Sequence, residues 1–181
     1  MVKLKNIKIS ELDEKNLSKI EFKLNKVLNK PTIDGVYYKN LIIHEDIRGD
    51  LTELWSKPWA DKEPVSPLVE HVYYNTTHEG VVKGWHMHKK TFSQYTCVIG
   101  KMQVVLADIR KDSPTYGYVD QFIIGAKNPA FIKIPPGVLK GWKSIKGDSV
   151  IINLLTSADV DDNYRVSWDS ILKKVWQPIN G

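Results

Sequence analysis

The chain of 181 residues is long enough to bury a sizeable core. No stretch of it has the composition of a long linker, so we expect one domain. Lys and Arg exceed Asp and Glu by 26 to 21. No arginine-rich stripe or basic-aromatic cluster accompanies this excess, so we expect no nucleic-acid partner. The single cysteine, Cys97, excludes an internal disulfide framework. No apolar run is long enough for a signal region or a membrane span, and we therefore expect a cytoplasmic protein without a membrane partner.

Residues 1–31 are predicted to form an N-terminal helical extension. Ser10 offers an N-cap, and apolar side chains follow at helical spacing until Pro31 breaks the pattern. The apolar positions are Leu17, Ile20, Leu24, Val27 and Leu28. We expect an amphipathic helix that packs on the body of the protein or on a partner chain.

Residues 32–181 change to short strand-like runs separated by turns rich in Gly, Pro, Asn and Asp. The runs are 36–43, 51–55, 69–75, 84–88, 94–99, 102–108, 118–124, 130–134, 150–155 and 165–168, with turns at 99–101 and 146–148 among others. Many short strands at this spacing predict an all-β antiparallel sandwich or jelly roll.

The run Gly84-Trp85-His86-Met87-His88-Lys89 lies in the middle of this region. Alternate side chains of a strand share a face, so His86 and His88 are expected to point into one cavity, for metal binding or proton transfer. Two histidines in a small barrel have the outline of a cupin. A metal-binding cupin would need a Glu soon after the second histidine and a third histidine later. Residues 89–100 contain no carboxylate, and Lys140 holds the later place. An ammonium beside a divalent cation is unfavourable, so we expect no metal and no other cofactor.

Six motifs occur in order along the chain. They are 46–53 (DIRGDLTE), 84–86 (GWH), 108–117 (DIRKDSPTYG), 134–137 (IPPG), 140–142 (KGW) and 168–169 (WD). Their order and spacing resemble the dTDP-4-keto-6-deoxyhexose (dTDP-4-dehydrorhamnose) 3,5-epimerase family over residues 35–176. The resemblance implies a cupin-type jelly-roll barrel, a homodimer and a metal-free isomerase. Its substrate would be a nucleotide-diphosphate sugar with a 4-keto group, in deoxysugar and surface polysaccharide biosynthesis.

The same resemblance assigns His86 as the base that removes a proton beside the ketone. A stabiliser for the resulting enolate and a second proton donor are also needed. Ser93 stands where the family has the stabilising lysine, and Asn153 where it has the proton-donating tyrosine. Lys140 replaces a common histidine, and His88 replaces a glutamine.

Strand parity suggests substitutes for the two missing groups. Tyr95 shares a face with Ser93, and Tyr73 shares one with His71. Either phenol is a candidate acid, and Lys140 a candidate for stabilising an enolate. The alternative for each tyrosine is a hydrogen-bonded side chain of the barrel interior. His88 would either orient His86 or be a satisfied polar group at the barrel mouth.

Candidate ligand-binding residues are His71, Ser93 and Asn153 near the sugar and, by the resemblance, Arg48, Glu53 and Lys83. Arg48 and Lys83 match positions that grip phosphate, with Lys140 a further cation. Lysine lacks the two-pronged grip of arginine. The alternative for Arg48 is a surface ion pair with Glu53.

Two other functions stay open. The element His86-x-His88-Lys89 also resembles the sugar-nucleotide 3,4-ketoisomerases, which shuttle protons on one face of the ring and need no opposed tyrosine. The third possible function is a barrel that binds a nucleotide sugar and does not convert it. The motif at 108–117 favours the epimerases, which we place first.

Overall fold

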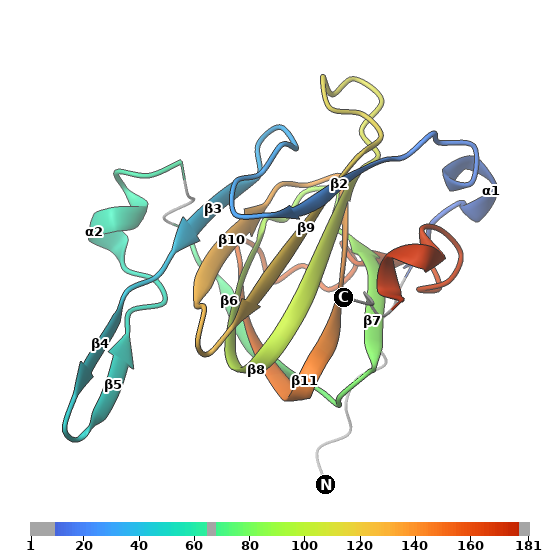
Figure 1. The fold of residues 1–181 in the computed structure, drawn as a ribbon. Coiled ribbons are helices and arrows are strands. Elements are labelled where there is room, and N and C mark those ends of the chain that lie inside the picture. Colours follow the sequence, from blue (N-terminus) through green and yellow to red (C-terminus); the bar gives the residue numbers. More distant parts are fainter. Residues whose placement is uncertain (1–9, 65–67, 178–181) are drawn as a thin grey trace, which may run out of the picture.

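Two long antiparallel strands form the frame of the molecule (Figure 1). The computed structural model describes residues 10–64 and 68–177. Strands β8 (Ser93–Asp108) and β11 (Val138–Leu155) pair from Val138–Asp108 at one end to Leu155–Ser93 at the other. Their interior positions carry a large share of the buried apolar side chains among the described residues, as expected for strands buried in a barrel.

Shorter strands extend this ribbon on both sides. They are β1 (Ser10–Glu11), β2 (Lys23–Leu28), β3 (Tyr37–Asn40), β6 (His71–Thr77), β7 (Val82–Met87), β9 (Tyr118–Gly125), β10 (Ala130–Ile134) and β12 (Tyr164–Arg165). On one half of the ribbon β7 pairs with β11 and β9 pairs with β8. On the other half β6 pairs with β11 and β10 pairs with β8.

The ribbon bends at its middle and closes into a barrel. The register of β11 shifts between Ser144 and Val150, opposite Gly100, whose φ is +74°. A side chain at Gly100 would collide with the carbonyl oxygen of Asp148, so this bend requires glycine. The result of the bend is that Tyr95 packs edge-on against Trp142, with ring centroids 5.6 Å apart. A straight strand would separate these levels of the ribbon by roughly 35 Å.

The all-β prediction is confirmed, but the N-terminal helix is much shorter than predicted. Helix α1 spans only Glu14–Leu17 and is capped by Asp13 rather than Ser10. Residues Lys23–Leu28 form β2, which pairs in parallel with β9. A short helix is marginally stable without tertiary contacts, whereas pairing with the edge of β9 ties this segment to the sheet, which explains why strand pairing overrides the helical spacing. Residues 1–9 of the predicted extension lie outside the described residues.

Two predicted turns are also wrong. Residues 99–101 lie inside β8, and residues 146–148 lie inside β11. Both segments are the bent middle of the ribbon, where glycines permit curvature without ending the strand.

A hairpin arm projects from the barrel (Figure 1). It consists of β4 (Ile43–Asp46) and β5 (Gly49–Thr52), and helix α2 (Lys57–Ala60) follows it. The arm exposes Ile47 and Leu51. On the other side of the barrel lies the short helix η1 (Lys173–Trp176). In the described part of the chain, no helix is long and apolar enough to cross a membrane.

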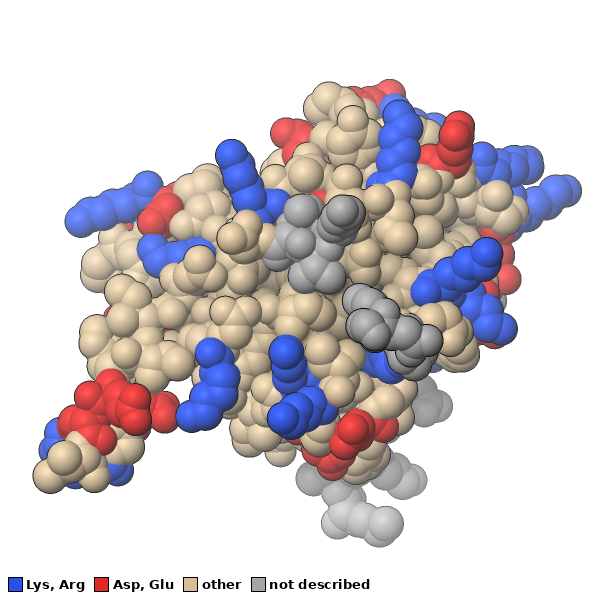
Figure 2. Space-filling model, in the orientation of Figure 1, with Lys and Arg blue, Asp and Glu red and all other residues tan. Residues whose placement is uncertain are grey.

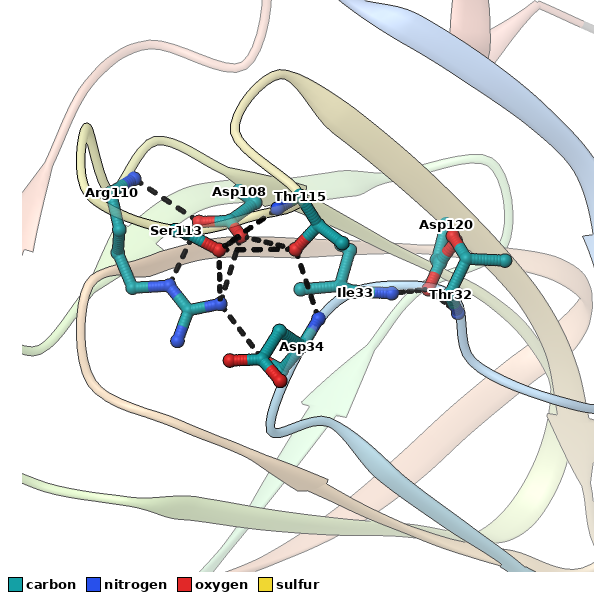
Figure 3. A network of polar contacts seen from close by, with 8 residues as sticks. All are labelled: Thr32, Ile33, Asp34, Asp108, Arg110, Ser113, Thr115 and Asp120. Carbon is teal, nitrogen blue, oxygen red and sulfur yellow. Dashed lines mark hydrogen bonds and ion pairs between the residues drawn. The ribbon is translucent and has the colours of Figure 1, made fainter.

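Two buried carboxylates, one at the end of β8 and one near the start of β9, hold the neighbouring loops by hydrogen bonds (Figure 3). Asp108 accepts hydrogen bonds from Arg110, Ser113 and Thr115, and Arg110 also donates to the carbonyl of Asp34. Asp120 accepts from the backbone N–H groups of 32 and 33. The motif at 108–117 is thus a structural clamp, as charged groups that are buried and fully paired usually are.

Candidate functional site

A cavity of about 900 Å³ lies inside the barrel and is lined from two sides. We call one side the histidine wall: Lys83 and His86 of β7, Lys140 and Trp142 of β11 and Arg165 of β12. We call the other the tyrosine wall: His71, Tyr73 and Asn75 of β6 and Tyr95 of β8. The bend of β8 and β11 turns these two halves of the ribbon toward one another.

Strand pairing places three cationic or basic side chains in one row across the histidine wall. Arg165 pairs directly with His86, and His86 pairs directly with Lys140. Directly opposed residues of antiparallel strands project from the same face of the sheet. The row therefore leads from an exposed guanidinium to an amine that is only 2% exposed.

His86 is held by packing, with no hydrogen bond to its ring from any described residue. Its imidazole stacks on Trp142 with centroids 6.1 Å apart. Burial, and then the charges of Lys140 and Arg165, lower the pKa of His86 to about 4. The ring is therefore neutral at pH 7 and able to accept a proton.

The side chain of Lys140 lines the cavity, and its amine makes no hydrogen bond or ion pair with any described residue. Burial lowers its pKa to about 7, against the opposing charge of Asp162. An unpaired buried amine costs free energy that an apolar side chain of similar size would not. Such groups cluster at functional sites.

His88 also lines the cavity, as predicted, but it lies beside the row. Its ring Nδ1 is 3.5 Å from the hydroxyl of Ser93, and burial lowers its pKa to about 3. Next to it, Asp162 accepts hydrogen bonds from the N–H groups of residues 89–91 and from the Thr91 hydroxyl. Asp162 thereby ties the cavity-lining segment 157–163 to the end of β7.

The phosphate-binding candidates are arranged differently from the prediction. The ammonium of Lys83 lines the cavity but already donates to Asn75 and to the carbonyl of Thr76. Arg165, which the sequence did not single out, lines the cavity with its side chain unpaired among the described residues. The other two arginines of the sequence are paired, Arg48 with Asp46 and Arg110 with Asp108.

On the tyrosine wall, both phenols have a hydrogen-bond partner, Asn153 for Tyr73 and Ser93 for Tyr95. The hydroxyl of Tyr73 accepts from Nδ2 of Asn153 at 2.8 Å. The hydroxyl-bearing ring of Tyr95 is only 2% exposed and packs in the core against Trp142. Burial raises the pKa of both phenols. Ser93 and Asn153 are buried behind the cavity surface.

Arg48 and Glu53 lie at the hairpin arm and not at this cavity. The alternative for Arg48, an ion pair with Glu53, does not form, because Arg48 pairs with Asp46 two residues away, and Glu53 accepts from the hydroxyl of Ser56 at 2.9 Å. The turn of the hairpin favours the shorter contact.

Within residues 10–64 and 68–177, no three His, Cys, Asp or Glu side chains are grouped so that they could hold a metal ion. The charged groups that act on the two histidines are Lys140, Lys83 and Arg165, together with the carboxylate of Asp162 beside His88. Over the face of the molecule in Figure 2, Lys and Arg are spread out with carboxylates among them.

Residues 30–179 match the family described as dTDP-4-dehydrorhamnose 3,5-epimerase. The chain is 35% identical over 144 residues to a probable low-salt glycan biosynthesis epimerase of Haloferax volcanii, covering 77% of this chain and 90% of that protein. It is 33% identical to a spore coat polysaccharide biosynthesis protein of Bacillus subtilis, covering 76% and 91%.

Among solved structures, an epimerase of Mycobacterium tuberculosis superposes with a TM-score of 0.71 at 22% identity, over 78% of this chain and 73% of that one. A 3'-monoepimerase of Streptomyces bikiniensis, solved with dTDP-quinovose, has a TM-score of 0.71 at 21% identity, over 78% and 74%. These likenesses confirm the cupin-type jelly roll. The sequence matches confirm the resemblance drawn from the six motifs, and the chain belongs to the dTDP-4-dehydrorhamnose 3,5-epimerase family, a family of isomerases.

Proposed function

We propose that the protein epimerises a nucleotide-diphosphate sugar, with dTDP the expected nucleotide, at one or both carbons beside a C4 ketone. The observation that carries this proposal is the row Arg165–His86–Lys140, which places a neutral base between two unpaired cations. The family and the glycan and polysaccharide names of its relatives support the substrate class.

The chemistry assigns one task to each member of the row. His86 takes the proton from C3 or C5, and the electron pair moves onto the ketone oxygen. Lys140, when protonated, stabilises the resulting enolate in surroundings of low dielectric. A tyrosine on the opposite wall then returns a proton to the other face of the same carbon, which inverts it. Exchange with water resets the imidazolium and the phenolate.

The diphosphate occupies the exposed end of the row in this proposal. A guanidinium binds phosphate oxygens with two parallel hydrogen bonds, and Arg165 has both edges unused by described residues. Lys83 adds charge nearby, although its Asn75 and Thr76 contacts limit its reach. His71 belongs to the tyrosine wall, and it would contact the part of the ligand beyond the diphosphate.

We propose a homodimer as the working unit. The hairpin arm leaves Ile47 and Leu51 in solvent, and apolar side chains clustered on a projecting arm are typical of an interface. Arg48 and Glu53 would then serve a ligand only at the partner's cavity. A cytoplasmic location is part of the proposal and suits the lone, free Cys97.

A 3,4-ketoisomerase is the second candidate. It is favoured by one observation: His86 and His88 both reach the cavity from the same strand end. Two bases on one side of a sugar could move a proton along one face. Tyr73, facing them from the other wall, favours epimerisation instead.

Incubation of the protein with dTDP-4-keto-6-deoxyglucose and related 4-ketosugars in deuterated buffer separates these functions. Deuterium at C3 and C5, or at C3 alone with inversion, supports the epimerase. Deuterium at C4 with the carbonyl moved to C3 supports the ketoisomerase. A ketosugar that binds in calorimetry yet gains no deuterium would show a binding module and contradict the proposal.

A further inference from the structure

We propose that Asn153 is a positioning residue that holds the Tyr73 hydroxyl as the proton donor for inversion. The inference rests on the proposed epimerase function and identifies which phenol acts and what aims it. It also gives a role in proton transfer to a residue that the sequence suggested only as a ligand contact.

The orientation of the Asn153 amide is fixed from both ends. Its Oδ1 accepts the backbone N–H of Gln94 at 3.2 Å, so the other end of the amide must be the NH₂ group. That NH₂ group donates to Tyr73 Oη at 2.8 Å. Because the phenol oxygen accepts this bond, its own proton is not used by Asn153 and is free to point into the cavity.

Strand register makes the pair rigid. Asn153 of β11 lies directly opposite Tyr73 of β6, so the two side chains project together from one face of the sheet. Asn153 is 1% exposed, whereas Tyr73 is half-buried and lines the cavity. The amide is thus a buried support, and the phenol is the part that a substrate would touch.

Tyr95 is the less suitable donor. Asn153 lies opposite Tyr95 as well, on β8, but the Tyr95 ring is packed in the core against Trp142. Tyr95 also borders the cavity and is hydrogen-bonded to Ser93, but its ring is only 2% exposed, whereas Tyr73 is half-buried. Tyr73 is therefore the phenol that a substrate reaches more readily.

The same hydrogen bond helps the chemistry. Burial raises the pKa of Tyr73, and the Asn153 bond opposes that rise because it stabilises the phenolate left after donation. A carboxylate at position 153 would reverse both effects. It would accept the phenol proton, turn it away from the cavity and repel the phenolate.

The test compares two rates in deuterated buffer: deuterium entry into the ketosugar, which reports proton removal, and inversion at the same carbon. For Tyr73→Phe and Asn153→Asp we expect inversion to fall about 100-fold relative to deuterium entry, because the proton still leaves but returns to the same face. Tyr95→Phe is the matched control and is expected to keep the wild-type ratio.

A structural role for Asn153 would lower both rates together and leave their ratio unchanged, which would overturn the proposal. Loss of inversion in Tyr95→Phe but not in Tyr73→Phe would also overturn it. Wild-type protein that shows no deuterium entry at all would contradict the epimerase function itself. If Asn153→Asp does not fold, Asn153→Ala replaces it, because it removes the amide donor to Tyr73 and keeps the phenol. We expect the same fall in the ratio of inversion to deuterium entry.

Discussion

The two walls of the cavity differ in how well their polar groups are satisfied. On the histidine wall, Lys140 and Arg165 have no partner among the described residues, and His86 has only a ring contact. On the tyrosine wall, the Tyr73 oxygen and the Asn153 amide are joined in one hydrogen-bonded chain. A wall that lacks countercharge suits a ligand that brings it, as a diphosphate and an enolate do. A satisfied wall suits the transfer of one proton from a neutral group.

Replacement of Lys140 tests the buried end of the histidine wall and has the largest expected effect among the support residues. Lys140→Met should lower kcat by about 10²- to 10³-fold, because no charge then faces the enolate. It should also raise the free energy of unfolding by about 3 kcal/mol near pH 6, since an unpaired buried ammonium is removed.

This stabilisation has a defined dependence on pH. The pKa of Lys140 falls from 10.5 to about 7 on folding, so the cost of the buried charge is greatest below pH 7 and fades as pH rises toward 10.5. Chemical denaturation of both proteins at several pH values measures it. A variant that is less stable than wild type at every pH would contradict an unpaired amine.

Replacement of Arg165 tests the exposed end. Arg165→Gln should weaken dTDP binding about 30-fold and leave thymidine binding unchanged, because only dTDP carries the diphosphate. Calorimetry with both ligands measures this. Arg48→Gln, which lies outside the cavity of its own protomer, separates the two possible diphosphate sites. A loss of dTDP binding in Arg48→Gln with none in Arg165→Gln would place the diphosphate at the arm of a partner protomer and contradict the assignment of Arg165.

The pH profile of kcat/KM should show the ionisation of His86 and of Lys140. Activity falls about tenfold per pH unit below about pH 4, where His86 becomes protonated, and again above about pH 7, where Lys140 loses its charge. Lys140→Arg should keep its charge and lose the alkaline fall. An alkaline fall that persists in Lys140→Arg assigns that limb to another group.

Tyr95→Phe should have the smallest effect, less than about threefold on kcat, because the ring packs against Trp142 and its hydroxyl does not carry the proton. Steady-state kinetics measures it. A loss as large as that of Tyr73→Phe would mean that the tyrosine wall works through both phenols.

Motif and strand parity predicted much of the cavity. Lys83 and His86 come from β7, His88 follows the end of that strand directly, and alternation placed Tyr73 beside His71 correctly. Such residues are predictable because the period of a strand is local and is set by the backbone.

Contacts between distant segments could not be predicted. Arg165 joins the row only because β12 pairs with β7, and a lone arginine in a two-residue strand has no signature in the sequence. Asn153 gains its role only from its position opposite Tyr73. Leu24 and Leu28 follow a helical spacing, yet the free edge of β9 draws them into a strand.

The most direct test of the account is the rate of deuterium entry from deuterated buffer into a 4-ketosugar, measured for His86→Asn beside His78→Asn, whose histidine is exposed and paired with Asp148. We predict that His86→Asn abolishes deuterium entry while dTDP still binds, and that His78→Asn behaves as wild type. Deuterium entry at the wild-type rate in His86→Asn would contradict the account, because proton removal would then belong to another residue.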